Sequence, residues 1–199
     1  TMVMQDPRFS LNPVMRIGDQ IAETLRVHGV GGRGRALRAK VLEVLSAVQI
    51  RDPERVYRAY PHELSGGMGQ RAMIAMMLIS NPALLIADEP TSALDVTVRR
   101  EILAIMDRLV SERGTGLILI SHDLNLVAGF CDRVLILYAG RGVEEIEASR
   151  LHDCRHPYSR GLLASLPLLD QPREQLATLQ RDPAWLGGPV YRFGVEVPE

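Results

Sequence analysis

At residues 84–90 the chain reads Leu84-Leu85-Ile86-Ala87-Asp88-Glu89-Pro90, a short apolar run that ends in two carboxylates. Such a run is typical of a strand that is buried on both faces of a parallel sheet. A second apolar run, Leu117–Ile120, follows a segment with helical spacing, Val98–Val110. The order strand, helix, strand is the repeating unit of a parallel sheet, so we predict an α/β fold.

Upstream of this unit the pattern is helical. Apolar residues recur every three or four positions in Ile17–His28 and in Leu37–Val48, which indicates two amphipathic helices. A third helix is expected from Arg71 to Ser80, after turns at Pro53 and Pro61.

The two ends of the chain have a different character. The first seven residues resemble the end of an apolar strand followed by a turn, so we expect the chain to begin within a domain. Val134–Tyr138 and its return through Gly142-Val143-Glu144 predict a terminal strand or hairpin. After Ser149 repeated prolines predict a short helix near Tyr158–Leu166 and an otherwise largely irregular tail.

Composition narrows the classes of partner. The 199 residues hold 23 Lys and Arg against 24 Asp and Glu, so the net charge of -1 gives no overall attraction to nucleic acid. The apolar runs are far shorter than the roughly 18 residues that cross a bilayer. We therefore expect a soluble, cytoplasmic protein. Its two cysteines, Cys131 and Cys154, are too few for a disulfide framework.

Asp88 and Glu89 are the first candidate site residues. They follow a strand directly, and open parallel sheets bind their ligands at the carboxyl ends of their strands. In nucleotide hydrolysis, an aspartate here can hold Mg²⁺ and an adjacent glutamate can polarise the attacking water. Two ordinary surface acids at the end of a strand remain an equally open interpretation.

Ser65-Gly66-Gly67 is the second candidate. It precedes a helix, so free backbone N–H groups and the positive end of the helix dipole make an anion site there, and the Ser65 hydroxyl adds a donor. An ordinary helix cap explains the same residues. The interpretation depends on what accompanies them.

Five motifs occur along the chain in a fixed order. Together they resemble the motifs of the nucleotide-binding subunit of ABC transporters, over residues 1 to about 145. They are Gln5, Leu64–Gln70, Leu84–Pro90, Ser92–Asp95 and Ser121-His122-Asp123. The resemblance implies a partial P-loop NTPase (RecA-like) core with a parallel sheet, an ABC helical subdomain and an irregular C-terminal tail. It implies an ATPase domain at 1–149, with a helical subdomain at 14–80 and core elements at 81–149, followed by a tail at 150–199.

The resemblance also implies roles in catalysis. Gln5 would be the Q-loop glutamine, which touches Mg²⁺ and senses the membrane subunit. Asp88 would be the aspartate linked to Mg²⁺, Glu89 the general base, and His122 the switch histidine on the γ-phosphate. An imidazole can donate to a phosphate oxygen near neutral pH, which agrees with that role.

The remaining implied roles concern a second subunit. Ser65, Gly66 and Gly67 would form the signature that reaches the γ-phosphate of ATP bound by the opposite subunit, and Asp95 would support the dimer interface. The implied partners are a second ABC ATPase subunit, transmembrane permease subunits and, indirectly, an extracytoplasmic substrate-binding protein, with no nucleic acid. The subunit would lie at the cytoplasmic face of the membrane.

A narrower resemblance points to importers of dipeptides, oligopeptides or nickel. Met4-Gln5-Asp6-Pro7, Ser10–Pro13 and above all Arg155–Leu163, with its His-Pro-Tyr segment, carry it. Relatives often bind an iron–sulfur cluster through a cysteine-rich tail. Cys154 alone cannot hold one, so we expect no cluster.

One motif of the family is missing. A P-loop requires G-x-x-x-x-G-K-[ST], whose lysine reaches the β and γ oxygens, and the only lysine here is Lys40, between Ala39 and Val41. We therefore expect the C-terminal portion of an ATP-hydrolysing importer subunit that is inactive by itself. The alternative is a non-catalytic partner that supplies its signature in trans. A soluble ABC protein that acts on DNA or ribosomes fits the neutral charge less well.

Overall fold

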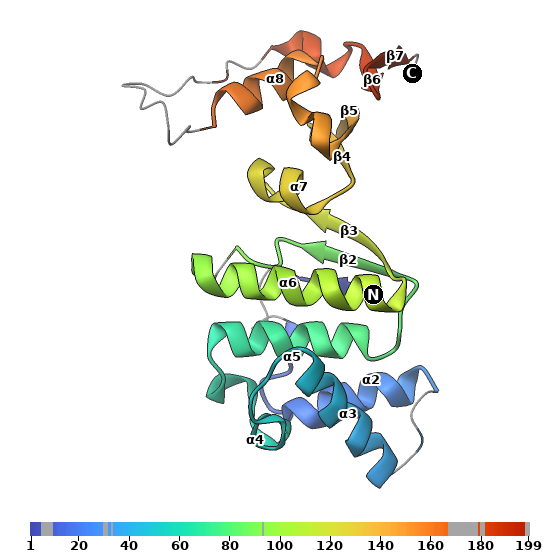
Figure 1. The fold of residues 1–199 in the computed structure, drawn as a ribbon, viewed down its shortest axis with the longest axis vertical. Coiled ribbons are helices and arrows are strands. Elements are labelled where there is room, and N and C mark those ends of the chain that lie inside the picture. The colour runs from blue at the N-terminus through green and yellow to red at the C-terminus, as the bar shows by residue number, and fades with distance from the viewer. Residues whose placement is uncertain are drawn as a thin grey trace. The chain divides into compact units, whose positions relative to one another are not determined.

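A computed structural model describes residues 1–4, 10–29, 32, 34–92, 94–166, 179 and 182–197. The chain forms two compact units, Thr1–His122 and Asp123–Glu199 (Figure 1). This division falls earlier than the domain boundary predicted at residue 149, because compactness follows contacts whereas that boundary followed a change in composition. The division into an ATPase domain and a tail stays a prediction.

The first unit contains a three-stranded parallel sheet, which confirms the predicted α/β class. Its strands are β1 (Met2–Val3), β2 (Leu84–Asp88) and β3 (Gly116–Ile120), in the order β1-β2-β3. The register aligns Met2 with Ile86, and Ile86 with Ile118. Parallel neighbours end at the same edge, so residues that follow β2 and β3 meet there.

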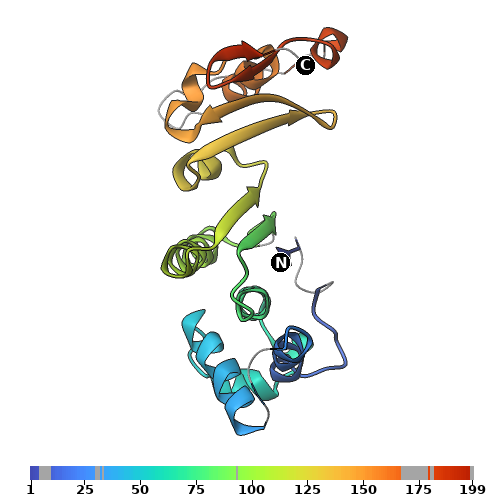
Figure 2. The same cartoon turned by 90° about the vertical axis from the view of Figure 1, so that its right-hand side faces the viewer.

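Two long helices accompany this sheet. Side chains on α6 (Val96–Arg113) are buried at the spacing of a single helical face, at Ile102, Ile105, Met106 and Leu109. The helix α5 (Gly66–Leu78) lies between the strands and the helices nearer the start of the chain (Figure 2). Alternate side chains of β2 differ in exposure, since Leu85 is fully buried and Leu84 is 42% exposed.

The helical segment consists of α2 (Ile17–Val27), α3 (Arg35–Ala47), α4 (Pro53–Arg58) and a short 3₁₀ turn, η1 (Pro61–Glu63). The first two agree with the predicted helices to within two residues at each end. The turn expected at Pro53 is instead the start of α4. Proline suits the first helical position, and the Asp52 side chain caps that helix by accepting a hydrogen bond from the Arg55 N–H at 3.0 Å.

The second unit is built on a four-stranded sheet. It holds the helices α7 (Leu124–Phe130) and α8 (Pro157–Ala164), with the 3₁₀ segments η2 (Ala148–Asp153) and η3 (Pro183–Leu186). Its strands, in the order β4-β5-β6-β7, are β4 (Arg133–Tyr138), β5 (Arg141–Glu147), β6 (Val190–Arg192) and β7 (Val195–Val197).

The predicted hairpin is confirmed, since β4 and β5 pair antiparallel. The sequence did not predict β6 and β7, because three-residue strands carry too little periodicity to be recognised. β6 pairs parallel with β5 and antiparallel with β7, so part of the tail extends the hairpin sheet.

A buried carboxylate organises the second unit. Glu144 of β5 is 0% exposed and accepts hydrogen bonds from the backbone N–H groups of Arg155, at 2.6 Å, and His156, at 3.2 Å. Burial lowers the pKa of His156, which keeps its ring neutral at pH 7. Its Nδ1 can then accept a hydrogen bond from the Tyr158 N–H at 3.1 Å, which caps α8. Glu144 and His156 therefore hold the His-Pro-Tyr segment at the start of α8.

Within the part of the chain that the structure describes, no helix is both long enough and apolar enough to span a bilayer.

Candidate functional site

Glu89 lies immediately after β2, at the edge of the sheet where the sequence placed it. Its backbone N–H donates to the Ile120 carbonyl at 2.9 Å, which continues the ladder between β2 and β3. Its φ of 46° is in the left-handed region, which a residue other than glycine rarely adopts. Strained backbone conformations of this kind are found at functional sites more often than elsewhere.

The Glu89 carboxylate contacts His122, which follows β3. Glu89 Oε1 accepts a hydrogen bond from the His122 backbone N–H at 2.9 Å and lies 2.6 Å from Nδ1 of the same ring. The Glu89 side chain is 18% exposed and the His122 side chain 79% exposed. The two residues meet because β2 and β3 are parallel neighbours that end at the same edge. A fixed carboxylate beside an accessible imidazole can hold and pass a proton.

Asp88, the last residue of β2, is half-buried and precedes Glu89 directly. Among the described residues no group of three or more His, Cys, Asp or Glu side chains forms a metal cage. Mg²⁺ in nucleotide sites is usually bound by one or two carboxylates together with substrate phosphates and water. Asp88 at the strand end fits that mode of binding, in which the nucleotide completes the coordination.

Ser65, Gly66 and Gly67 lie at the start of α5. Ser65 is the N-cap residue, and its Oγ accepts a hydrogen bond from the Met68 N–H at 3.4 Å. Ser65 and Gly66 are exposed, and the first turn of a helix leaves backbone N–H groups without intrahelical acceptors. The helix cap that the sequence suggested is therefore formed, while the binding of an anion at this exposed helix N-terminus stays a prediction.

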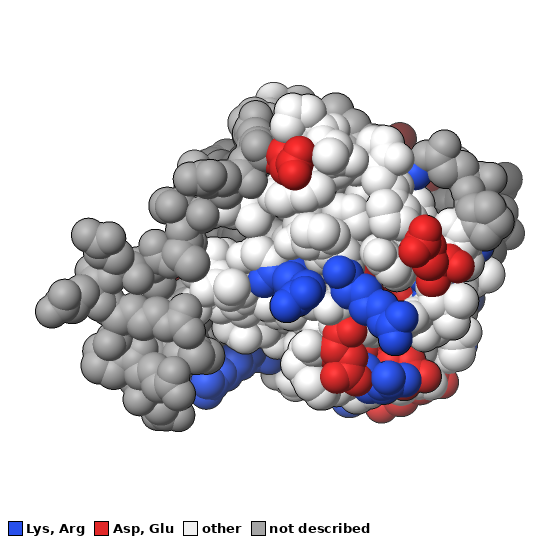
Figure 3. Space-filling model, turned by 90° about the horizontal axis from the view of Figure 1, so that it is seen from above, with Lys and Arg blue, Asp and Glu red and all other residues white. Residues whose placement is uncertain are grey.

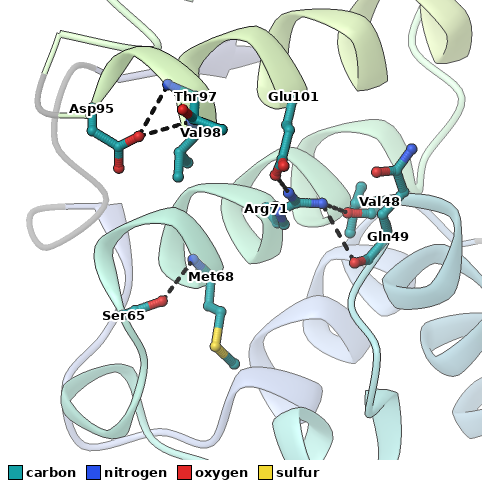
Figure 4. A network of polar contacts seen from close by, with 9 residues as sticks. All are labelled: Val48, Gln49, Ser65, Met68, Arg71, Asp95, Thr97, Val98 and Glu101. Atoms are coloured by element: carbon teal, nitrogen blue, oxygen red, sulfur yellow. Dashed lines mark hydrogen bonds and ion pairs between the residues drawn. The ribbon is translucent and has the colours of Figure 1, made fainter.

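Asp95 caps the neighbouring helix. Its Oδ1 accepts hydrogen bonds from the N–H groups of Thr97 and Val98 in the first turn of α6, both at 3.0 Å. Figure 4 shows both caps, with Ser65 at the start of α5 and Asp95 at the start of α6. The predicted role of Asp95 at a dimer interface stays a prediction, and within this chain the residue begins α6.

The two helices lie close together at Gly67. A Cβ atom added to Gly67 would lie 2.8 Å from Cγ1 of Val98, whereas one added to Gly66 would lie 4.0 Å from Leu94 Cδ2. The Val98 methyl belongs to a β-branched side chain that is stiff in a helix, so it cannot easily move aside. The absence of a side chain at Gly67 therefore sets the spacing of the two N-termini.

Replacing Gly67 with alanine is expected to lower the free energy of unfolding of the first unit by about 1–3 kcal/mol, the usual cost of overpacking. The matched control is Gly66→Ala, for which the added methyl meets only an ordinary contact. Thermal unfolding of both variants, followed by circular dichroism, measures the difference. Equal stability of the two variants would show that α5 and α6 can separate freely at this point.

Of the residues predicted from the sequence, the structure joins Glu89 to His122, places Asp88 beside them, and places Ser65–Gly67 and Asp95 at two neighbouring helix starts. Gln5 lies outside the described residues. Sequence analysis used Arg71 only as a helix boundary, yet its side chain bridges α5 to α6 and to the end of α3. The only signal in the sequence was an arginine that follows the Leu64–Gln70 motif directly, because its partners lie 22 to 30 residues away and leave no local pattern.

Comparison with known proteins agrees with this arrangement. Residues 1–92 match the protein-family model described as ABC transporter. The matched part of the chain is similar to that family, and it contains β2 and the start of α5 with Ser65–Gly67. The resemblance inferred from the five motifs is confirmed.

The relatives that follow are bacterial proteins named as ATP-binding proteins of peptide transport. The chain is 53% identical over 174 residues to a peptide import ATP-binding protein of Brucella ovis, an alignment that covers 87% of this chain and 51% of the relative. It is 46% identical over 184 residues to the oligopeptide transport ATP-binding protein OppD of Salmonella typhimurium, which covers 92% of this chain and 55% of the relative. The chain thus spans about half the length of the curated relatives it matches.

Solved structures confirm the fold class. The dimeric ATP-binding cassette MJ0796, in a post-hydrolysis state bound to ADP and Pi, superposes with a TM-score of 0.63 at 28% identity, over 74% of this chain and 63% of that one. CbiO1 of Clostridium perfringens, part of the ABC transporter complex cbiONQ, superposes with a TM-score of 0.65 at 26% identity, over 76% of this chain and 58% of that one.

Proposed function

We propose that this chain is part of an ATP-hydrolysing subunit that powers the import of peptides. The observation that carries the proposal is the contact of Glu89 Oε1 with both the backbone N–H and the ring of His122 at the edge of the sheet. The names of the relatives support peptides as cargo over nickel, the other cargo class that the sequence suggested.

The residues of this chain would act at the γ-phosphate of ATP. Glu89, fixed by the His122 N–H, would accept the proton of the attacking water, since its carboxylate is held at the strand end. The exposed ring of His122 would donate a hydrogen bond to a phosphate oxygen. Mg²⁺, when bound, neutralises phosphate charge, and Asp88 with Gln5 would hold it.

A second subunit completes the proposed site. The accessible N-terminus of α5, with Ser65, Gly66 and Gly67, would reach the nucleotide bound by the facing subunit, and Asp95 would lie at that interface. Each nucleotide would then contact both subunits, so ATP binding would favour the closed dimer. Closure is proposed to drive permease subunits that contact the chain near Gln5 and the helical segment 14–80, while an extracytoplasmic binding protein delivers the cargo.

The proposed location is the cytoplasmic face of the membrane, as a peripheral subunit. Acidic and basic side chains are interspersed on one face of the molecule (Figure 3), and the formal net charge is -1. This surface supports protein partners rather than nucleic acid.

An iron–sulfur cluster is not part of the proposal. Burial, with a further contribution from the Glu144 charge, raises the pKa of the Cys154 thiol to about 11. Burial also raises the pKa of Cys131. The cysteine ligands of such clusters number four in the common types, and this chain has two cysteines, Cys131 and Cys154.

One experiment distinguishes an ATP-hydrolysing subunit from a non-catalytic partner that supplies its signature in trans. The chain of residues 1–199 is expected neither to bind nor to hydrolyse ATP, because it has no P-loop lysine to bind the β- and γ-phosphates. The same chain extended upstream to include a P-loop is expected to hydrolyse ATP at about 1–10³ turnovers per second, the ordinary range for enzymes.

Phosphate release with Mg²⁺ and ATP, together with equilibrium binding of a fluorescent ATP analogue, measures both chains. An extended chain that binds ATP but does not turn it over would support the non-catalytic partner instead. Tight binding of the ATP analogue by residues 1–199 alone would contradict the proposed nucleotide site.

A further inference from the structure

Arg71 of α5 holds together three helices of the first unit. Its Nη1 donates to the carbonyl oxygens of Val48, at 3.1 Å, and Gln49, at 3.4 Å, and its Nη2 lies 2.6 Å from Oε2 of Glu101 on α6 (Figure 4). The Arg71 side chain is only 12% exposed. A guanidinium with several donors in a fixed plane can bind these partners at once, which a lysine ammonium does less well.

The carbonyls that Arg71 binds belong to the end of α3. Helix C-termini carry partial negative charge and carbonyl oxygens without intrahelical donors, so arginines are favourable there. A second arginine, Arg108 of α6, donates to the neighbouring Ala47 carbonyl at 2.5 Å. Gln49 has a φ of 60°, which turns the chain directly after the helix. The end of α3 is therefore held by side chains from both α5 and α6.

The same bridge lies close to the candidate site. Arg71 is six residues after the cap Ser65, and Glu101 is six residues after the cap Asp95, so the ion pair joins the two helices at equal distances from their starts. At 1.5 Å per residue this is about 9 Å along each helix. The contact of Gly67 with Val98 joins them again within the first turn. Two contacts on one side of the helices fix both their spacing and their relative shift.

We propose that Arg71 is a positioning residue for ATP hydrolysis, which fixes the starts of α5 and α6 relative to the C-terminal end of α3. This inference rests on the proposed function. A displacement of α3, which packs against α2, α4 and α5, would reach both Ser65 and Asp95 through Arg71, because this side chain of α5 contacts the end of α3 and Glu101 of α6 together.

The role of Arg71 is one of geometry more than of stability. The Glu101 side chain is 51% exposed, and an ion pair that solvent reaches usually contributes little to the free energy of unfolding. Misplacement of a reacting group by about 1 Å, in contrast, can lower a rate about 10²-fold. A loss of the bridge should therefore affect turnover more than folding.

The test uses the chain extended upstream to include a P-loop, with the variants Arg71→Met, Arg71→Lys, Glu101→Gln and Arg108→Met. Arg108→Met is the matched control, because it also removes an arginine from the end of α3 but leaves the bridge between α5 and α6 intact. In Arg71→Met we expect kcat to fall about 10- to 100-fold with the KM for ATP changed less than about threefold. Glu101→Gln should show a smaller loss in kcat, Arg71→Lys should recover part of it, and Arg108→Met should keep the wild-type kcat.

Amide hydrogen exchange in the absence of nucleotide provides a readout that does not depend on ATP hydrolysis. The capped N–H groups of Met68, Thr97 and Val98 are expected to exchange about tenfold faster in Arg71→Met than in Arg108→Met, because the helix starts lose their bracing. If the wild-type extended chain fails to hydrolyse ATP, the proposed function is wrong. The exchange rates then still test whether Arg71 fixes the starts of α5 and α6. If the wild type is active and Arg71→Met and Arg71→Lys both keep its kcat and its exchange rates, the role of Arg71 is overturned.

Discussion

Replacing Glu89 with glutamine is expected to lower the ATP turnover of the upstream-extended chain by about 10²- to 10⁴-fold, the usual contribution of a general base. Glutamine has nearly the same shape, and its amide oxygen can still accept the hydrogen bond from the His122 N–H that the Glu89 carboxylate accepts at 2.9 Å. It cannot take a proton from water. The geometry should therefore survive while the chemistry stops.

ATP binding by Glu89→Gln is expected to stay within about threefold of the wild type, because the lost interaction belongs to the transition state. Single-turnover phosphate release measures the chemical step, and a fluorescent ATP analogue measures binding. The control is Glu112→Gln, which removes an exposed carboxylate from α6 outside the site. A Glu89→Gln turnover within tenfold of the wild type would mean that another group activates the water.

Replacing Glu144 with alanine is expected to lower the free energy of unfolding of the second unit by about 2–4 kcal/mol. The fully buried Glu144 carboxylate is the acceptor for the N–H groups of Arg155 and His156, and alanine would leave both donors without it. A buried donor that loses its acceptor costs about 1–3 kcal/mol. Glu144→Gln should cost less, because the amide oxygen can still accept one of the two hydrogen bonds.

Urea unfolding followed by tryptophan fluorescence measures this effect. Trp185 is the only tryptophan, and its ring lies 5.5 Å from that of Tyr138 and 5.7 Å from that of Tyr158, within the second unit. The control is Glu145→Ala, one residue further along β5. Its carboxylate pairs with the exposed Arg133 at 3.1 Å, so its loss should cost at most about 1 kcal/mol. Similar losses of unfolding free energy at Glu144 and Glu145 would show that the hydrogen bonds from the Arg155 and His156 N–H groups to Glu144 contribute little to stability.

The two carboxylates of this comparison also illustrate a limit of sequence reasoning. Glu144 and Glu145 are adjacent and chemically identical in the sequence, yet one is fully buried and the other pairs at the surface. Strand alternation predicts that they face opposite ways but not which one faces the core. Only the return of the chain at Arg155 and His156, which brings two backbone donors to β5, determines that Glu144 is the buried one.

Local patterns did determine much of the first unit. The helical spacing of α2, α3 and α6 is periodic over enough residues to identify each helix and its buried face, and the apolar runs identify β2 and β3. The expectation that these runs are buried on both faces was wrong for the described chain, since Leu84, Ile118 and Ile120 are 42%, 47% and 45% exposed. The placement of Glu89 and His122 follows from them, because residues that succeed neighbouring parallel strands must meet at one edge. The family resemblance could be read from the same short segments.

Tertiary structure alone decided the features that join distant segments. The φ of Glu89, the approach of Gly67 to Val98 and the bridge from Arg71 to Glu101 and the end of α3 depend on how helices and strands pack. The short strands β6 and β7 likewise depend on pairing, since β6 pairs with β5 and β7 pairs with β6. Periodicity records which face of an element is apolar, whereas these contacts depend on which partner covers that face, and the partner lies far away in the sequence.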